Sequence, residues 1–212
     1  MNKKLLTIIG AVCLGIASLA QAQDGSIGVY LDAAGTQCDG TAMPGTPLDG
    51  SVWVNLAGST TAGITGAEFR IDPADLTGDY VYVATSNPVA NIVLGDPFNS
   101  LGVNIGFPTC QDGATNSGRV QLFTFQVVDL SPSASQNNWL TLRQRFTPTN
   151  PNFRCALVTL CDSPAFTKVC LSAPDSDHWR AVVNPGVGVS GNCSPVAVEE
   201  GTWSKVKDLY RN

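Results

Sequence analysis

The only histidine of this chain, His178, is the first candidate for acid-base catalysis. It lies in the polar segment 175–180, just before an apolar run. A serine hydrolase would need a nucleophile on a sharp turn, but Gly-x-Ser-x-Gly does not occur and Ser190 misses this pattern. The zinc-binding His-Glu-x-x-His motif and the phosphate-binding Gly-x-x-x-x-Gly-Lys motif do not occur either. We therefore interpret the segment around His178 as a polar turn. A hydrolase with two carboxylates stays an alternative, since any two acids can meet in space.

Two groups of aspartates are candidates for a calcium site, because hard carboxylate oxygens suit this ion. Asp72, Asp75 and Asp79 cluster in one segment rich in turn residues, and Asp32 and Asp39 flank another. Neither group has the spacing of an EF-hand loop. Calcium is the one cofactor that the sequence suggests. The alternative is that these aspartates are solvated residues in turns.

Aromatic side chains offer a second kind of binding site, since sugar rings stack on flat aromatic faces. The main candidates are Trp53, Tyr80 and Tyr82, with Trp139 and Trp179 as further ones and Asn55 as a neighbouring hydrogen-bonding group. Tyr80 and Tyr82 alternate with Val81 and Val83, so one pair should face the core and the other pair solvent. The alternative is that each aromatic side chain only packs in the fold.

The N-terminus has the three regions of a cleavable secretory signal peptide. Lys3 and Lys4 precede an apolar run over residues 5–19, and a small-x-small site follows at residues 20–22. The run is shorter than the roughly 18 to 20 residues that span a bilayer, and no lipobox precedes Cys13. We predict that residues 1–22 are removed and that the mature protein begins at Gln23, in the periplasm, on the cell surface or outside a bacterium.

Six cysteines remain once Cys13 leaves with the signal peptide, and an even number in an exported protein predicts disulfides. They are Cys38, Cys110, Cys155, Cys161, Cys170 and Cys193. No Cys-x-x-Cys pair supports the alternative, a thiolate metal site. Six cysteines allow 15 pairings. A hairpin around residues 162–165 would join Cys161 to Cys170, and we complete this set by elimination with Cys38–Cys110 and Cys155–Cys193.

The mature chain is acidic and poor in charged residues. Loss of Lys3 and Lys4 changes its formal net charge from −5 to −7, and charged residues make up 14% of the whole sequence, against about 25% in typical domains. Such a surface does not attract nucleic acid or anionic membranes. We therefore expect a protein or a polysaccharide as partner and no transmembrane span after cleavage.

Short segments of alternating apolar residues, bounded by Gly, Pro, Asn and Asp, predict an all-β, antiparallel β-sandwich, such as an Ig-like/jelly-roll one, over residues 23–197. The predicted strands are 27–31, 51–56, 67–71, 80–84, 91–94, 101–107, 120–128, 139–142, 157–160, 168–171 and 181–183. Segment 120–128 is apolar on both faces for much of its length and should be a central strand. In segment 67–71, Glu68 and Arg70 should face solvent. Residues 72–79 should form an exposed loop.

Residues 198–212 are predicted to be a linker followed by a short amphipathic helix. Trp203, Val206, Leu209 and Tyr210 fall on one face of this helix. A helix of about ten residues is marginal alone in water. We expect this apolar stripe to be recognised by a sorting factor, a surface or another protomer, and the alternative is that it docks on its own sandwich.

Residues 63–76, with the phrase Gly-Ala-Glu-Phe followed by Asp-Pro-x-x-Leu, resemble the early part of cohesin-type and related carbohydrate-binding sandwiches. Residues 44–48 stand where such domains have a Pro-Gly-Asp step. Residues 160–169 and 203–211 resemble segments of uncharacterised secreted bacterial proteins. The first resemblance implies a cohesin-like fold, but it does not extend to a cohesin's dockerin partner. The sequence thus favours a secreted, non-enzymatic binding or assembly protein, with a carbohydrate-binding module and a secreted hydrolase as alternatives.

Overall fold

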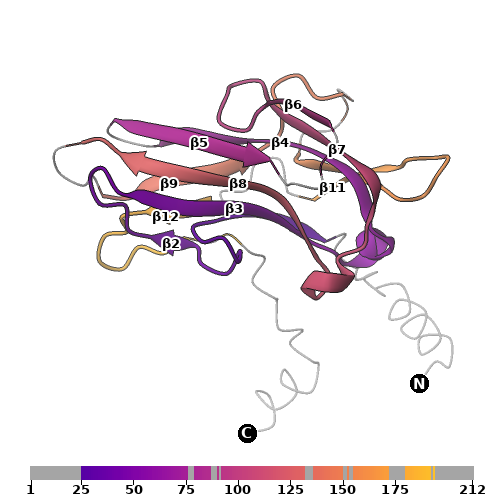
Figure 1. Cartoon of the computed structure of the whole chain (residues 1–212), viewed down its shortest axis with the longest axis horizontal. Coiled ribbons are helices and arrows are strands. Elements are labelled where there is room, and N and C mark those ends of the chain that lie inside the picture. Colours follow the sequence, from indigo (N-terminus) through magenta and orange to yellow (C-terminus); the bar gives the residue numbers. More distant parts are fainter. Residues whose placement is uncertain are drawn as a thin grey trace, which may run out of the picture.

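The computed structural model describes only part of the chain. The described residues are 25–75, 79–86, 90, 92–131, 136–149, 152, 155–171, 180–191 and 193, and the side chains of 73–75 and 84–86 are not among the described parts. Two β-sheets pack face to face and enclose one main hydrophobic core (Figure 1). Within the described residues, no helix is long and apolar enough to cross a membrane.

The first sheet has four strands, and every neighbouring pair in it is antiparallel. In spatial order they are β1 (Ser26–Tyr30), β3 (Pro47–Asn55), β8 (Arg119–Asp129) and β5 (Tyr80–Ser86). Strand β8 lies between β3 and β5, which confirms the prediction of a central strand over residues 120–128.

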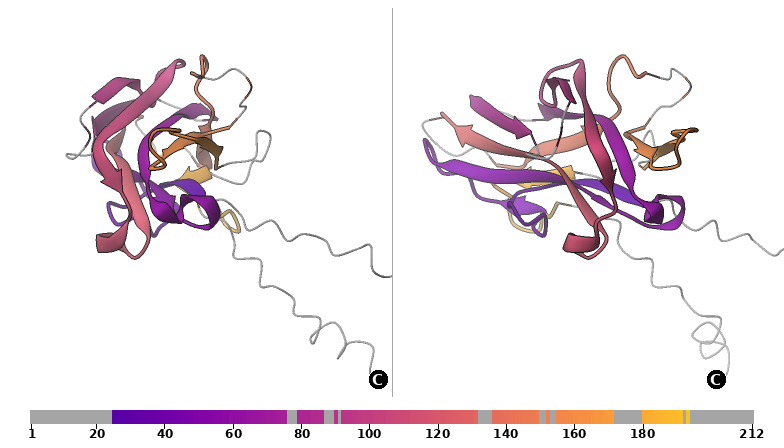
Figure 2. Two further views of the ribbon diagram at one scale, coloured as in Figure 1. Left: turned by 90° about the vertical axis from the view of Figure 1, so that its right-hand side faces the viewer. Right: turned by 45° about the vertical axis from the view of Figure 1, so that its right-hand side comes forward.

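The second sheet is larger and branches at its longest strand (Figure 2). Its main path is β11 (Lys168–Cys170), β10 (Leu157–Leu160), β4 (Ile64–Asp75), β9 (Asn138–Arg143), β12 (Arg180–Val183) and β2 (Asp39–Gly40). Strand β7 (Gly102–Gln111) also pairs with β4, and β6 (Ile92–Asp96) pairs with β7. Two short 3-10 helices, η1 (Gly58–Ala62) and η2 (Ala114–Asn116), lie in connecting segments. Every strand predicted from the sequence is present, and the described residues add β2, which runs parallel to β12.

The core follows from alternation along the strands, which a bulge interrupts in strand β8. The β3–β8 register passes from Val52–Phe123 directly to Trp53–Gln121, so that Leu122 is the extra residue of a β-bulge. Leu122 and Phe123 can therefore both face the core, although they are consecutive, and both are buried. This bulge explains why β8 has apolar residues at neighbouring positions.

Strand β4 is longer than the sequence predicted, and the prediction of an exposed loop from residue 72 is wrong over 72–75. Asp72 pairs with Thr141 and Asp75 with Trp139 of strand β9, with a register shift between the two pairs. The shift accommodates Pro73, which cannot donate to the ladder. Pairing with β9 thus outweighs the local turn preference of these residues.

All six cysteines of the described residues form disulfides, but each pair predicted from the sequence is wrong. The bonds are Cys38–Cys193, Cys110–Cys161 and Cys155–Cys170. Cys170 lies opposite Leu157 in the β10–β11 hairpin, which brings it to Cys155 instead of Cys161. Cys161 follows the end of β10 and meets Cys110 of β7, because both strands flank the first part of β4. The hairpin was predicted correctly, but its register selects a different pair.

Candidate binding surfaces

One half of the outer face of the first sheet is covered by the chain itself. Tyr30 and Trp53 form a small second core with the Cys38–Cys193 disulfide. The guanidinium group of Arg119 lies 4.7 Å from the centre of the Trp53 ring, and it donates hydrogen bonds to the carbonyl oxygens of Ala34 and Gly35. The segment after β1 is thereby held over this half of the sheet.

The other half of this outer face is open among the described residues. Val81 and Val83 of β5 are 43% and 50% exposed. Beside them, the Gln126 side chain donates a hydrogen bond of 2.9 Å to the carboxylate of Asp49. A hollow of about 340 Å³ lies here. We call the surface formed by Asp49, Val81, Val83, Thr124 and Gln126 the valine face.

The structure places the three predicted ligand-binding aromatic residues in packed positions. Trp53 is only 8% exposed, and its indole N–H donates to Ser51 Oγ at 3.0 Å. Tyr80 and Tyr82 are the pair that faces the core, and the alternating valines are the exposed pair. The Tyr82 ring stacks on Phe98 at 4.3 Å. Burial, together with the neighbouring Tyr80, raises the pKa of Tyr82 above its usual range.

Two further aromatic candidates remain. Trp139 also packs against another side chain, and Trp179 lies outside the described residues. The guanidinium group of Arg180 lies 4.0 Å from the ring centre of Trp139. Trp179 and His178 lie outside the described residues, as do the four residues of the C-terminal stripe. In the described part of the chain, core residues or arginines thus lie against each of these aromatic candidates.

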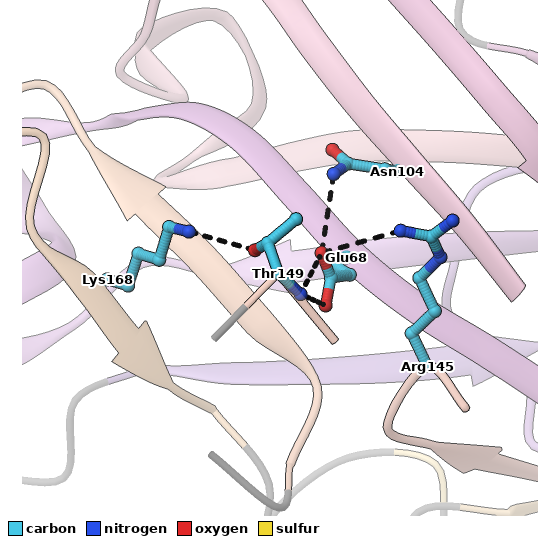
Figure 3. Close-up of polar contacts among 5 residues, drawn as sticks. All are labelled: Glu68, Asn104, Arg145, Thr149 and Lys168. Atoms are coloured by element: carbon cyan, nitrogen blue, oxygen red, sulfur yellow. Dashed lines mark hydrogen bonds and ion pairs between the residues drawn. The ribbon is translucent and has the colours of Figure 1, made fainter. Parts of the chain in front are cut away.

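A polar site lies on the outer face of the second sheet, around Glu68 (Figure 3). The backbone N–H of Thr149 donates to both Glu68 carboxylate oxygens, at 3.0 and 3.3 Å. The Asn104 amide donates at 3.3 Å, and Arg145 forms a longer ion pair at 3.9 Å. On the other side of the loop, Lys168 donates to Thr149 Oγ1 at 2.8 Å. Glu68 therefore fastens the segment after β9 to the sheet.

The prediction that Glu68 faces solvent is wrong, since this residue is only 4% exposed. The alternation was read correctly, because Glu68 points away from the core residues Ala67 and Phe69. However, the segment that contains Thr149 covers it from outside. A segment about 80 residues away in the sequence does not affect the alternation of apolar and polar residues along β4. The roles of Asn104, Arg145 and Lys168 were missed for the same reason.

The predicted calcium ligands do not form a cluster among the described residues. Asp72 lies between two guanidinium groups, 3.5 Å from Arg70 and 3.2 Å from Arg143. The side chain of Asp75 lies outside the described parts, so the Asp72, Asp75 and Asp79 site stays a prediction. In the described residues, no three side chains of His, Cys, Asp or Glu are close enough to hold a metal ion.

The second pair of aspartates serves the covered half of the first sheet. Asp32 accepts hydrogen bonds from the backbone N–H groups of Thr36 and Gln37, at 2.7 and 3.0 Å, and from the Thr36 hydroxyl. Burial alone would raise the pKa of Asp32, but these hydrogen bonds and the charge of Arg119 outweigh burial and lower it. Asp39 accepts a hydrogen bond from the backbone of Gly191. Both carboxylates thus stabilise loops.

The number of carboxylates in each hollow is relevant to whether that hollow could hydrolyse a glycoside. Three hollows formed by described residues contain one carboxylate each, from Asp49, Glu68 and Asp112. Glycoside hydrolysis commonly needs two carboxyl groups on either side of the bond that breaks. Hydroxyl, amide and ammonium groups line the hollow at Glu68 and can form hydrogen bonds with a ligand. Each of these three hollows therefore has groups that can bind a ligand but lacks the second carboxyl group of an acid-base pair.

Comparison with known proteins gives matches only among solved structures. No family model matches the sequence, and no curated protein matches it. The sixth cohesin of Acetivibrio cellulolyticus scaffoldin B, solved in complex with a mutant Cel5 dockerin, is 12% identical with a TM-score of 0.42, and the match covers 76% of this chain and 99% of that cohesin.

Two further solved structures match to a similar degree. The solution structure of CaCohA2 from Clostridium acetobutylicum is 11% identical with a TM-score of 0.39, and the match covers 78% of this chain and 94% of that protein. A cohesin module from a family 33 glycoside hydrolase of Clostridium perfringens is 10% identical with a TM-score of 0.38, over 77% of this chain and 99% of that module. The predicted fold class is confirmed by the structure itself, since the described strands form a β-sandwich in which all pairs but β2–β12 are antiparallel.

Proposed function

We propose that this chain is an exported, non-enzymatic module that binds a protein partner outside the cytoplasm through its valine face. The observation that carries the proposal is the contrast between the two halves of one sheet surface. One half buries Tyr30 and Trp53 beneath a disulfide-linked segment, whereas the other half leaves Val81 and Val83 exposed. Neighbouring apolar side chains with polar residues around them are typical of protein-interaction sites.

A protein fits the valine face better than a polysaccharide does. The exposed side chains here are aliphatic, and the nearby aromatic rings face the core. Sugar recognition commonly uses exposed aromatic rings, and aliphatic side chains give no such stacking surface. The Asp49–Gln126 hydrogen bond leaves further amide and carboxylate positions for polar contacts at the rim.

Export is supported by the state of the cysteines. All six cysteines of the mature chain are joined in disulfides, and such bonds persist mainly in oxidising compartments. Together with the signal peptide predicted over residues 1–22, this supports a site of action in the periplasm, on the cell surface or outside the cell. Intact mass spectrometry of exported protein should give a chain that begins at Gln23, and recovery of the Met1 form from membranes would contradict export.

The binding face can be tested by site-specific crosslinking. The mature protein with p-benzoylphenylalanine at position 83 should crosslink a protein from the surface fraction or medium of the producing cells. The captured protein is then purified and its affinity measured for the wild type and for Val83→Glu. We expect at least a tenfold loss of affinity, because the substitution places a charge in the apolar centre of the interface.

Val187→Glu is the matched control, since Val187 is fully exposed in a turn away from the valine face. It should leave the affinity unchanged. An equal loss in both variants would show that the binding site is not the valine face. If the wild type binds to a glycan array and Val83→Glu does not, the partner of the valine face is a polysaccharide instead of a protein.

A further inference from the structure

A hollow of about 200 Å³ lies on the outer face of the second sheet, next to Glu68. Its floor is the directly paired glycines Gly66 of β4 and Gly106 of β7. One row of paired residues crosses the sheet here, and its members are Ile92, Gly106, Gly66, Thr159 and Lys168. Two adjacent positions without side chains leave bare backbone in the middle of this row.

Gly106 is not required by the backbone or by packing within the described residues. It is not among the glycines with positive φ. A Cβ atom at Gly106 would meet only Ile92, at 3.4 Å or more. By contrast, a Cβ atom at Gly66 would come within 2.8 Å of the Ile105 carbonyl oxygen. A glycine inside a strand is destabilising relative to alanine. Because Gly106 has no side chain, the space above the sheet stays open at this position.

The two ends of this row of residues differ in chemistry. Ile92 pairs with Gly106 beside the hollow, and Ile92 and Leu94 of strand β6 lie on the same face of the sheet and are 53% and 59% exposed. At the opposite end, Lys168 donates one hydrogen bond to Thr149. An ammonium group has three N–H donors, so Lys168 can also bind a carboxylate. Glu68 is already engaged by Thr149, Asn104 and Arg145.

We propose that this hollow binds an aromatic side chain of a partner polypeptide, with a neighbouring carboxylate of that partner on Lys168. The ring would lie flat on the paired Gly66 and Gly106 backbone and contact Ile92 with its edge. Aromatic side chains are known to cover glycines in sheets in this way, and aromatic anchors in small pockets dominate many interfaces.

The size and lining of the hollow favour this occupant over others. Pockets for whole small molecules commonly measure about 300–1,000 Å³, so about 200 Å³ suits a single side chain better. No aromatic residue of the described part of the chain lines the hollow, so these residues give no stacking surface of the kind that a sugar would use. The hollow and the valine face lie on the outer faces of different sheets, so this inference does not depend on the proposed function.

The test uses two short probes with the ¹⁵N-labelled mature protein. N-acetyl-aspartyl-tyrosine amide should shift the Gly66 and Gly106 amide resonances and saturate in the millimolar range. N-acetyl-aspartyl-alanine amide should bind at least tenfold more weakly. Gly106→Val fills the hollow without strain at its own φ and should weaken binding of the tyrosine probe at least tenfold while the melting temperature does not fall.

Two further variants separate this site from the valine face. Lys168→Gln should weaken the aspartyl-tyrosine probe several-fold but leave N-acetyl-tyrosine amide unchanged. Val83→Glu should not affect either probe. The proposal is overturned if the tyrosine probe causes no shifts at Gly66 and Gly106, if Gly106→Val binds it normally, or if a cello-oligosaccharide produces the same shifts. None of these results bears on binding at the valine face.

Discussion

Gly28 of strand β1 lies directly beneath the backbone carbonyl of Cys193, so that a Cβ atom on Gly28 would come within 2.0 Å of the Cys193 oxygen. The last described residue of the chain therefore crosses the first strand at a position where only glycine fits. We expect Gly28→Ala to lower the free energy of unfolding by about 1–3 kcal/mol, the usual cost of overpacking. Urea denaturation of the oxidised protein measures this loss.

Gly106→Ala is the control for Gly28→Ala, because its Cβ atom has room and its φ is ordinary. This variant should be as stable as the wild type or slightly more stable, since alanine is favoured over glycine within strands. Equal destabilisation by both substitutions would show that contact with Cys193 is not the cause.

The three disulfides should differ in how much they stabilise the fold. Cys38–Cys193 closes a separation of 155 residues, whereas Cys155–Cys170 closes one of 15. In the chain-entropy model, these bonds contribute about 5 and about 3 kcal/mol. Replacing each pair with alanines and measuring the melting temperature should therefore give the larger fall for Cys38 and Cys193. Non-reducing peptide mapping checks the pairs themselves, and a Cys161–Cys170 peptide would contradict the structure.

Removal of the Glu68 carboxylate should release the loop that it holds. Glu68→Ala leaves the Thr149 N–H and the Asn104 amide without their acceptor, and such a loss costs about 1–3 kcal/mol. Hydrogen exchange of the Thr149 amide should become faster, and the unfolding free energy should fall. Glu68→Gln keeps one acceptor oxygen and should show a smaller effect. Unchanged exchange in the alanine variant would mean that other contacts hold this loop.

The acid behaviour of Asp162 can be tested directly. The hydroxyl and the backbone N–H of Thr167 donate to its carboxylate, and these bonds lower its pKa. Since the pKa in the folded protein lies below the unfolded value of about 3.9, the stabilising contribution is complete above about pH 4 and is lost as the pH falls through the folded value.

A carbon-13 NMR titration of the carboxyl groups measures the pKa of Asp162 without unfolding the protein. Thr167→Val removes the hydroxyl donor but keeps the backbone N–H, so the pKa of Asp162 should rise part of the way toward about 3.9. A folded wild-type protein in which Asp162 titrates at or above that value would contradict the hydrogen-bonding account.

Local features of the sequence predicted the strands and the class of the fold. Residues 157–160 form strand β10 as predicted, and residues 120–128 form the central part of β8. These predictions succeed because the side chains of a strand alternate between two faces, so that burial of one face appears as a pattern of period two. The even number of cysteines in the mature chain likewise predicted that all of them would form disulfides.

The tertiary structure decided which cysteines meet, which residues are covered and where open surface remains. The sequence placed Glu68 on the outer side of β4 but gave no sign of the loop above it. It showed that one of the pairs Tyr80–Tyr82 and Val81–Val83 must face inward, and packing against Phe98 and the core selected the tyrosines. Contacts between segments separated by many residues depend on sheet order and strand register, and alternation within a single strand contains no record of either.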